Sequence, residues 1–193
     1  ILEYALADGH KVCVLARNPT KLPPGKYNVT IQLGDVLDAD AVDDTVFGQD
    51  VVISALGLGA SPMPTAFSSG IANIVQAMQA HGVKRLVGIA GAGILNDPNR
   101  GGLRIDAPDY PEVYRPYAEE HKRIYELLQR SGLDWTLVCP PAMRDEAATG
   151  TVRTQIDTMP PGGRTVTYAD VARLAYSLAG NREELGHRLA IAD

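Results

Sequence analysis

The side chains best suited to hold a ligand follow short apolar segments of the chain. Arg17 comes directly after the apolar run 11–16, and Lys21 follows four residues later. A guanidinium offers forked donors and a permanent charge, which suit a phosphate group, and Lys21 could add a second charge. A solvated arginine at the end of a strand is the alternative. The pattern favours a phosphate contact at Arg17.

A carboxylate follows the second apolar run. This carboxylate is Asp35, between Gly34 and Val36. The small glycine leaves room for a planar ring such as adenine, whose exocyclic amine could donate a hydrogen bond to Asp35. The alternative is that Asp35 caps the following helix, for which Asp38 is a second candidate. The sequence leaves both roles open.

Small or rigid residues follow three further apolar runs. Ser54, Ala55 and Gly57 belong to the segment SALGLG, where they would let a ligand approach the backbone closely or would simply form a turn. Ala90 ends the next run. Pro140 ends the apolar run 135–140, where it either borders a ligand or only restricts the backbone at the end of a strand.

Strands and helices must bring these residues together, and the apolar pattern predicts them. The expected strands are 11–16, 29–34, 51–56, 85–90 and 135–140. The segments between them include 65–82 and 114–132, which have apolar residues at helical spacing and end in glycine. Nearly continuous apolar strands separated by helices predict one α/β domain over residues 1–193, with a doubly wound parallel sheet of Rossmann type.

In such a sheet, ligands bind at the carboxyl ends of the strands. The side chain that ends the second strand meets the adenosine ribose, where arginine accommodates the 2′-phosphate of NADP and an acidic residue accepts from the 2′-hydroxyl of NAD. Arg17 therefore predicts NADP(H) as the cofactor, with NAD(H) as the alternative. The adenine would then lie at Asp35, and the pyrophosphate and ribose beside Ser54.

The chain opens on the end of a helix, a turn at Gly9 and the strand that ends at Arg17. The strand order 3-2-1-4-5-6 of a Rossmann sheet puts a first strand and a Gly-rich phosphate loop ahead of this point. Without that central strand, its two neighbours would have unpaired inner edges, which are costly. We therefore expect the sequence to be a fragment of a longer polypeptide.

Two irregular stretches, 93–113 and 142–166, are rich in Gly and Pro and follow the carboxyl ends of strands. Loops of this length in a compact domain usually have a function. We expect both to contact substrate, the second as a flap.

Composition and charge limit the classes of molecule that the protein is expected to bind. The net charge is −5 and is spread along the chain, which argues against nucleic acid, and no apolar run is long enough to span a bilayer. Cys13 and Cys139 lie in apolar runs, which favours buried free thiols in a reducing cytosol. We expect a cytoplasmic monomer or homodimer with a small-molecule substrate and no metal.

Five segments resemble the atypical short-chain dehydrogenases/reductases, especially the NmrA-like and biliverdin reductase B (flavin reductase) branch. They are VLARNPTKL, QLGDVLD, VVISALG, VKRLVGIAGAG and RSGLDWTLVCPP, and the similarity covers essentially the whole chain. The resemblance implies a Rossmann fold, NADPH as the hydride donor, and a flavin, a quinone or another conjugated small molecule as the acceptor.

The resemblance also implies an active-site helix before SGLDWT, with the usual signature of Tyr, three residues, then Lys. That register holds Tyr117 and His121, which share a helix face. His121 replaces the lysine, as it does in the biliverdin reductase branch, and Gly91 stands where the family carries a serine. Tyr117 and His121 are therefore the candidate catalytic groups, and a solvated polar helix face is the alternative.

The missing serine bears on the reaction. Without its hydroxyl, alcohol–carbonyl chemistry loses a partner, whereas hydride transfer to a conjugated acceptor depends mainly on proximity and orientation. The sequence therefore predicts an NADPH-dependent reductase of such an acceptor. The alternatives are an NADP(H)-binding redox-sensing regulator without turnover, and a nucleotide-sugar epimerase or dehydratase.

Overall fold

The computed structural model describes residues 1–22, 29–57 and 65–193. Its helices are α1 (Leu2–Ala7), α2 (Ala39–Val46), α3 (Ala66–Ala80), α4 (Arg115–Gln129) and α5 (Tyr168–Ser177). Its strands are β1 (Val12–Ala16), β2 (Val29–Leu33), β3 (Val51–Ser54), β4 (Arg85–Ile89), β5 (Asp134–Cys139), β6 (Ala142–Arg144), β7 (Arg153–Ile156), β8 (Thr165–Thr167) and β9 (His187–Ala192). Short 3₁₀ turns are η1 (Pro19–Lys21), η2 (Ala92–Ile94), η3 (Arg104–Asp106) and η4 (Glu112–Tyr114).

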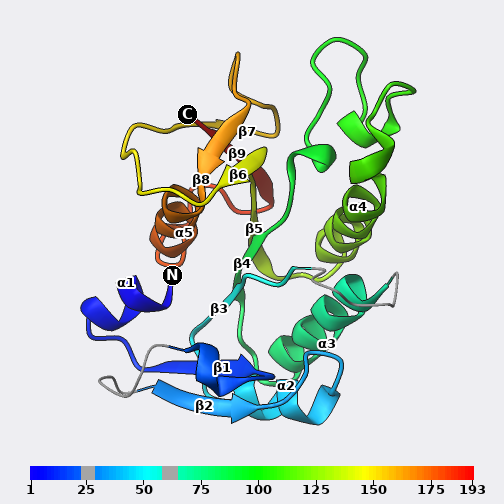
Figure 1. Ribbon diagram of the computed structural model, residues 1–193. Coiled ribbons are helices and arrows are strands. Elements are labelled where there is room, and N and C mark those ends of the chain that lie inside the picture. Colours follow the sequence, from blue (N-terminus) through cyan, green and yellow to red (C-terminus); the bar gives the residue numbers. More distant parts are fainter. Residues whose placement is uncertain (23–28, 58–64) are drawn as a thin grey trace.

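A mostly parallel sheet forms the centre of the molecule, in the order β3-β4-β5-β9-β7. Its first four strands run parallel, and β7 pairs antiparallel with β9 at the edge. The central strands β4, β5 and β9 are each buried at all but one position. Helices α3 and α4 cover one face and α5 covers the other (Figure 1). The predicted doubly wound α/β class is therefore confirmed.

Strands β1 and β2 form a separate parallel pair, in register from Val12–Val29 to Ala16–Leu33. Within the described ranges no ladder joins β1 to β3, so each of these strands has one edge without a strand partner. Figure 1 shows the β1–β2 pair set apart below β3. Although β1 is as apolar as the central strands, none of its residues is buried. The sheet is thus interrupted between β1 and β3, at the position that the order 3-2-1-4-5-6 assigns to the expected first strand.

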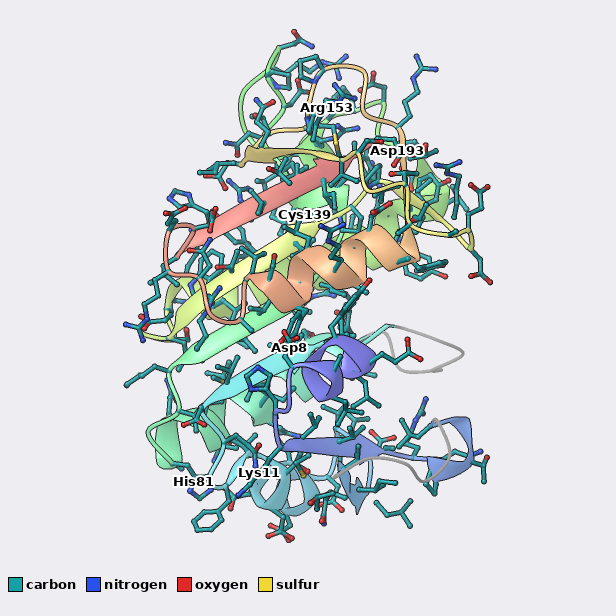
Figure 2. The ribbon with its side chains drawn as sticks, turned by 90° about the vertical axis from the view of Figure 1, so that its left-hand side faces the viewer. Asp8, Lys11, His81, Cys139, Arg153 and Asp193 are labelled. Atoms are coloured by element: carbon teal, nitrogen blue, oxygen red, sulfur yellow. The ribbon has the colours of Figure 1, made fainter. Side chains whose placement is uncertain are left out.

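Helix α1 lies over this interruption and is held from one side. Tyr4 stacks on Tyr176 of α5 with 5.9 Å between ring centroids, and the Tyr176 hydroxyl donates to Asp8, which Figure 2 labels. No residue of α1 is buried. The helix is therefore attached to α5 by polar and aromatic contacts rather than by a core.

The five predicted strands are confirmed to within two residues at each end. Gly82 and Gly132 have φ angles of +71° and +67°, as expected for glycines that stop helices. The strands β6, β7, β8 and β9 lie outside this predicted set. Cys139 is a buried free thiol as predicted, but Cys13 is only partly buried, because β1 lacks a neighbour on its inner edge.

The stretch 93–113 is folded against the sheet by Arg188, a buried residue of β9. Its guanidinium donates to the Ile94 carbonyl, and at 3.0 Å both to Asn96 Oδ1 and to Asp157 Oδ1. Asp157 adopts a φ of +58°, which is unusual for a residue other than glycine. These contacts fix the start of the stretch to the turn after β7.

The stretch 142–166 contains β6 and β7 and is held by Asp170 in the first turn of α5. The buried Asp170 carboxylate accepts hydrogen bonds from the amides of Thr149 and Gly150 at 2.8 and 3.1 Å. Thr167 is the N-cap of α5 and also donates its hydroxyl to Asp170 at 2.8 Å. One carboxylate thereby joins the stretch to the helix beneath it.

Candidate functional site

A cavity of about 890 Å³ separates β1 from β3. Residues 12–15 and 51–54 form two of its walls. Seven of the predicted ligand-binding residues also line it, namely Arg17, Gly34, Asp35, Val36, Ser54, Ala55 and Gly57. The strand order 3-2-1-4-5-6 places a further strand between these two, so the part of the space that bears on ligand binding is the part at the carboxyl ends of the strands. The cavity extends from the open strand edges to the carboxyl ends of three strands.

Arg17 and Asp35 lie close together at the ends of β1 and β2. Arg17 Nη1 is 3.6 Å from Asp35 Oδ2, and the Arg17 side chain is 76% exposed. Because an ion pair this exposed is weak, the guanidinium can turn towards a phosphate at little cost. Asp35 accepts from the Leu37 amide at 3.0 Å, whereas Asp38 is the residue that caps α2.

Gly34 and Val36 are fixed by the helices behind them. A Cβ on Gly34 would lie 2.5 Å from the Cβ of Ala41, so any side chain there would displace α2. The carbonyl of Val36 accepts from Asn73 Nδ2 at 2.9 Å, and its side chain lies against Gly70 of α3. Helices α2 and α3 therefore hold the turn after β2 against the cavity.

The remaining predicted cofactor residues lie in different surroundings. Ser54 is buried, whereas Ala55 and Gly57 are exposed, and the chain then enters residues 58–64, which lie outside the described part. Lys21 ends η1, and its side chain also lies outside the described part.

Ala90 and Pro140 are buried at the carboxyl ends of β4 and β5 but are not among the residues that line the cavity. The Ala90 amide donates to the Val138 carbonyl at 2.8 Å, and the Pro140 carbonyl accepts from the Ala92 amide at 3.0 Å. These bonds extend the pairing of the two strands to the point where η2 begins.

His121 of α4 lies beside Gly91, directly after β4. Its ring meets the Phe67 ring edge-on, with 5.2 Å between ring centroids. A Cβ on Gly91 would lie 3.0 Å from His121 Nδ1, so the imidazole fills the space that a serine side chain would need. Gly91 in place of the serine and His121 in place of the lysine therefore depend on each other sterically. Since Phe67 also lines the cavity, it connects His121 to the predicted cofactor residues.

The charge of His121 is set by its surroundings. Burial lowers the pKa of His121 from 6.5 to about 4, and the negative charge of Glu120 offsets only part of this effect. The imidazole is therefore neutral at neutral pH, with one N–H donor and one acceptor nitrogen.

Tyr117 lies one helical turn before His121 and is 50% exposed. Tyr117 and His121 lie on the same face of α4, as predicted, but only His121 contacts α3, through Phe67. The neighbouring Lys122 points elsewhere, since its Nζ lies 2.7 Å from Asp106 Oδ1. Within the described residues, His121 is the candidate catalytic group that contacts the cavity wall.

The chain matches a known protein family over most of its length. A family model described as NAD(P)H-binding matches residues 1–182. The chain belongs to this NAD(P)H-binding family. The family therefore indicates a nicotinamide cofactor for this chain.

Solved structures share the fold of this NAD(P)H-binding chain over nearly its whole length. One is a proposed exported protein from Burkholderia pseudomallei, with 26% identity, coverage of 99% of this chain and 91% of that chain, and a TM-score of 0.82. A proposed epimerase from Bacteroides thetaiotaomicron has 25% identity, coverage of 99% and 89%, and a TM-score of 0.84. A proposed NADH-flavin reductase from Streptococcus pneumoniae has 24% identity, coverage of 100% and 91%, and a TM-score of 0.83, and this likeness shows the fold alone.

The residues around the cavity of this NAD(P)H-binding domain fit a dinucleotide. Small-molecule sites are mostly apolar with a few polar groups. Here Arg17 and Asp35 supply those groups at one end. In the described ranges no helix is long and apolar enough to cross a membrane, and no group of three or more His, Cys, Asp or Glu side chains could hold a metal ion.

Two residues of the site are absent from the predicted set. Phe67 lines the cavity and contacts His121, and Glu120 is the buried residue that precedes His121 on α4. An aromatic residue at the start of a predicted helix, in the segment TAFSSG, is the signal that indicates Phe67. The sequence offers no comparable signal for Glu120, because its neighbours on the helix are equally polar.

Proposed function

We propose that this protein is an NADPH-dependent reductase of a small conjugated acceptor such as a flavin or a quinone. The observation that carries the proposal is the contact of His121 with Gly91 and Phe67 beside the cavity. A neutral imidazole stands where carbonyl chemistry would need a hydroxyl. Reduction of a conjugated acceptor needs no such hydroxyl, because its charge is delocalised over the ring system.

The bound nicotinamide would supply a hydride, and the acceptor takes up that hydride and one proton. With a pKa of about 4, His121 is a poor source of that proton at neutral pH. Its N–H can instead donate a hydrogen bond that orients the acceptor, while solvent provides the proton. Tyr117, which is exposed one turn away, is a second candidate donor.

The proposed cofactor contacts follow the strand ends. Arg17 holds the 2′-phosphate with Lys21 as a second charge, and Asp35 accepts from the adenine amine beside Gly34 and Val36. The pyrophosphate and ribose lie at Ser54, Ala55 and Gly57, and the nicotinamide lies near Ala90 and Pro140. Only the 2′-phosphate distinguishes NADPH from NADH, so Arg17 carries the choice of cofactor.

Arg17→Ala is expected to weaken NADPH binding by roughly 10- to 100-fold, since a charge-assisted contact contributes about 1.5–3 kcal/mol. NADH binding should change little, because NADH lacks the phosphate. Calorimetric titration of both cofactors measures the two effects, with Arg164→Ala as a charge-matched control on an exposed arginine. Equal losses for the two cofactors would contradict the assignment of Arg17, and no binding of either by the unmodified protein would contradict the proposed function.

His121→Ala is expected to lower kcat/KM with the best acceptor of a flavin and quinone panel by roughly 10- to 100-fold, through loss of the orienting donor. Lys122→Ala changes the adjacent residue, which is paired with Asp106, and should leave turnover unchanged. Unchanged turnover in the His121 variant would remove His121 from the reaction. Cofactor binding without turnover of any acceptor would favour the redox-sensing alternative, and conversion of a nucleotide sugar would favour the epimerase alternative.

A further inference from the structure

We infer that Glu120 is a positioning residue, whose buried carboxylate fixes α4 against α3 and thereby holds His121 at the site. The inference depends on the proposed function only for what His121 does there. The Glu120 side chain is 1% exposed. Because glutamate is almost never fully buried without partners, the location of this carboxylate calls for an explanation.

The partners of Glu120 lie on both helices. Glu120 Oε2 accepts from the Ser68 amide at 2.8 Å, and Oε1 accepts from the Ser68 hydroxyl at 3.3 Å. Arg123, one turn along α4, donates to Oε1. The carboxylate is thus satisfied by one residue of α3 and one of its own helix.

The Ser68 amide belongs to the first turn of α3, where helix amides have no partner within the helix. Thr65, the N-cap residue, makes no side-chain cap hydrogen bond. Glu120 therefore supplies the missing cap from another helix, and its negative charge is favourable at a helix N-terminus. This bond can form only when α3 and α4 are in one particular register.

That register also sets the position of the imidazole. Phe67 and Ser68 are consecutive on α3, and they contact His121 and Glu120, which are consecutive on α4. A shift of α4 by one residue, about 1.5 Å along its axis, would break the carboxylate bonds and the ring contact together. Gly91, on the other side of the ring, has no side chain that could direct it. The orientation of His121 is therefore determined from the α3 side, through Glu120.

The test compares Glu120→Ala and Glu120→Gln with Glu119→Ala, in which the altered acid is about half exposed and lies 3.9 Å from Arg123. The readouts are the rate at which diethyl pyrocarbonate modifies His121, located by peptide mass mapping, and the NMR shifts of its ring protons, which sense the Phe67 ring. The exposed His10 serves as the internal reference in each sample. Neither readout requires turnover, so failure of the reductase proposal and failure of this one are distinguishable.

Glu120→Ala is expected to raise the modification rate of His121 by about tenfold through local opening of the α3–α4 contact. Glu120→Gln keeps an acceptor oxygen for the Ser68 amide, so its increase should be smaller. Glu119→Ala should behave as the unmodified protein. If Glu120→Ala fails to fold, Glu120→Gln and Ser68→Ala carry the test. Variants with lower stability but an unchanged rate and unchanged ring shifts would overturn the inference, since Glu120 would then be only a structural clamp.

Discussion

Asp170→Ala is expected to lower the free energy of unfolding by about 3–5 kcal/mol, because hydrogen bonds to a charged group contribute about 1.5–3 kcal/mol each and the buried Thr167 hydroxyl loses its acceptor. Asp170 is 2% exposed and accepts from two amides and two hydroxyls, supplied by Thr149, Gly150 and Thr167. Alanine would leave all four donors without this acceptor. Chemical denaturation measures the loss, which corresponds to a fall in Tm of roughly 10 °C for a chain of this size.

The control for this prediction is Asp145→Ala, which removes an exposed acid from the same stretch and should change stability by no more than about 0.5 kcal/mol. Burial alone would raise the pKa of Asp170, but the hydrogen bonds from Thr149, Thr167 and Gly150 outweigh it and hold the pKa below its usual value. This stabilisation is present above the pKa of an unfolded aspartate, about 3.9, and is lost as the pH falls through the lower folded-state pKa. A loss no larger than that of the control would show that Asp170 does not hold the stretch.

The free energy of unfolding is expected to fall by up to about 3 kcal/mol between pH 6.5 and pH 4 because of His121 alone. In the folded protein burial lowers the pKa of His121 to about 4, whereas an unfolded histidine has a pKa of about 6.5. Between these values the unfolded chain binds a proton that the folded chain does not, so acidification favours unfolding. Denaturation curves at pH 7, 6 and 5 measure this contribution.

Substitution separates His121 from the other groups that titrate in this range. His121→Gln removes the titrating ring, so its free energy of unfolding should depend less on pH than that of the unmodified protein. The exposed His10 provides the matched control, and His10→Gln should preserve the original slope. Parallel pH curves for the unmodified protein and His121→Gln would mean that the ring is not held neutral in the fold.

The elements could be predicted because local pattern determines them. Apolar runs between helical segments located five strands, and the rule that parallel strands end at one edge brought Arg17, Asp35 and Ser54 to a single cavity. The strand β9 escaped prediction because it begins with the polar residues His187 and Arg188 and follows the polar turn after α5. A strand of this kind is defined by the neighbours it pairs with, which the sequence does not display.

The contacts between helices could not be predicted in the same way. The spacing of Tyr117 and His121 indicates a shared face but not which end of that face meets another helix. The absence of a serine at Gly91 was visible in the sequence, whereas the imidazole that takes its space becomes apparent only when α4 is packed on α3. Glu120 looks like one more solvated acid until Ser68, fifty-two positions away, is placed against it.

The gap between β1 and β3 lies where the order 3-2-1-4-5-6 places a further strand, and it separates two groups of site residues whose strands differ in burial. Strands β1 and β2 contribute no buried residue to the core, so their amides should exchange with solvent through local opening, whereas those of β4 and β5 should exchange only through far larger openings. Arg17 and Asp35 follow the weakly buried strands β1 and β2, whereas Gly91 and His121 lie at the end of the buried strand β4. A strand placed between β1 and β3 would cover the inner edge of β1 and reduce this difference. Exchange of the β1 amides would therefore report whether that position in the sheet is filled.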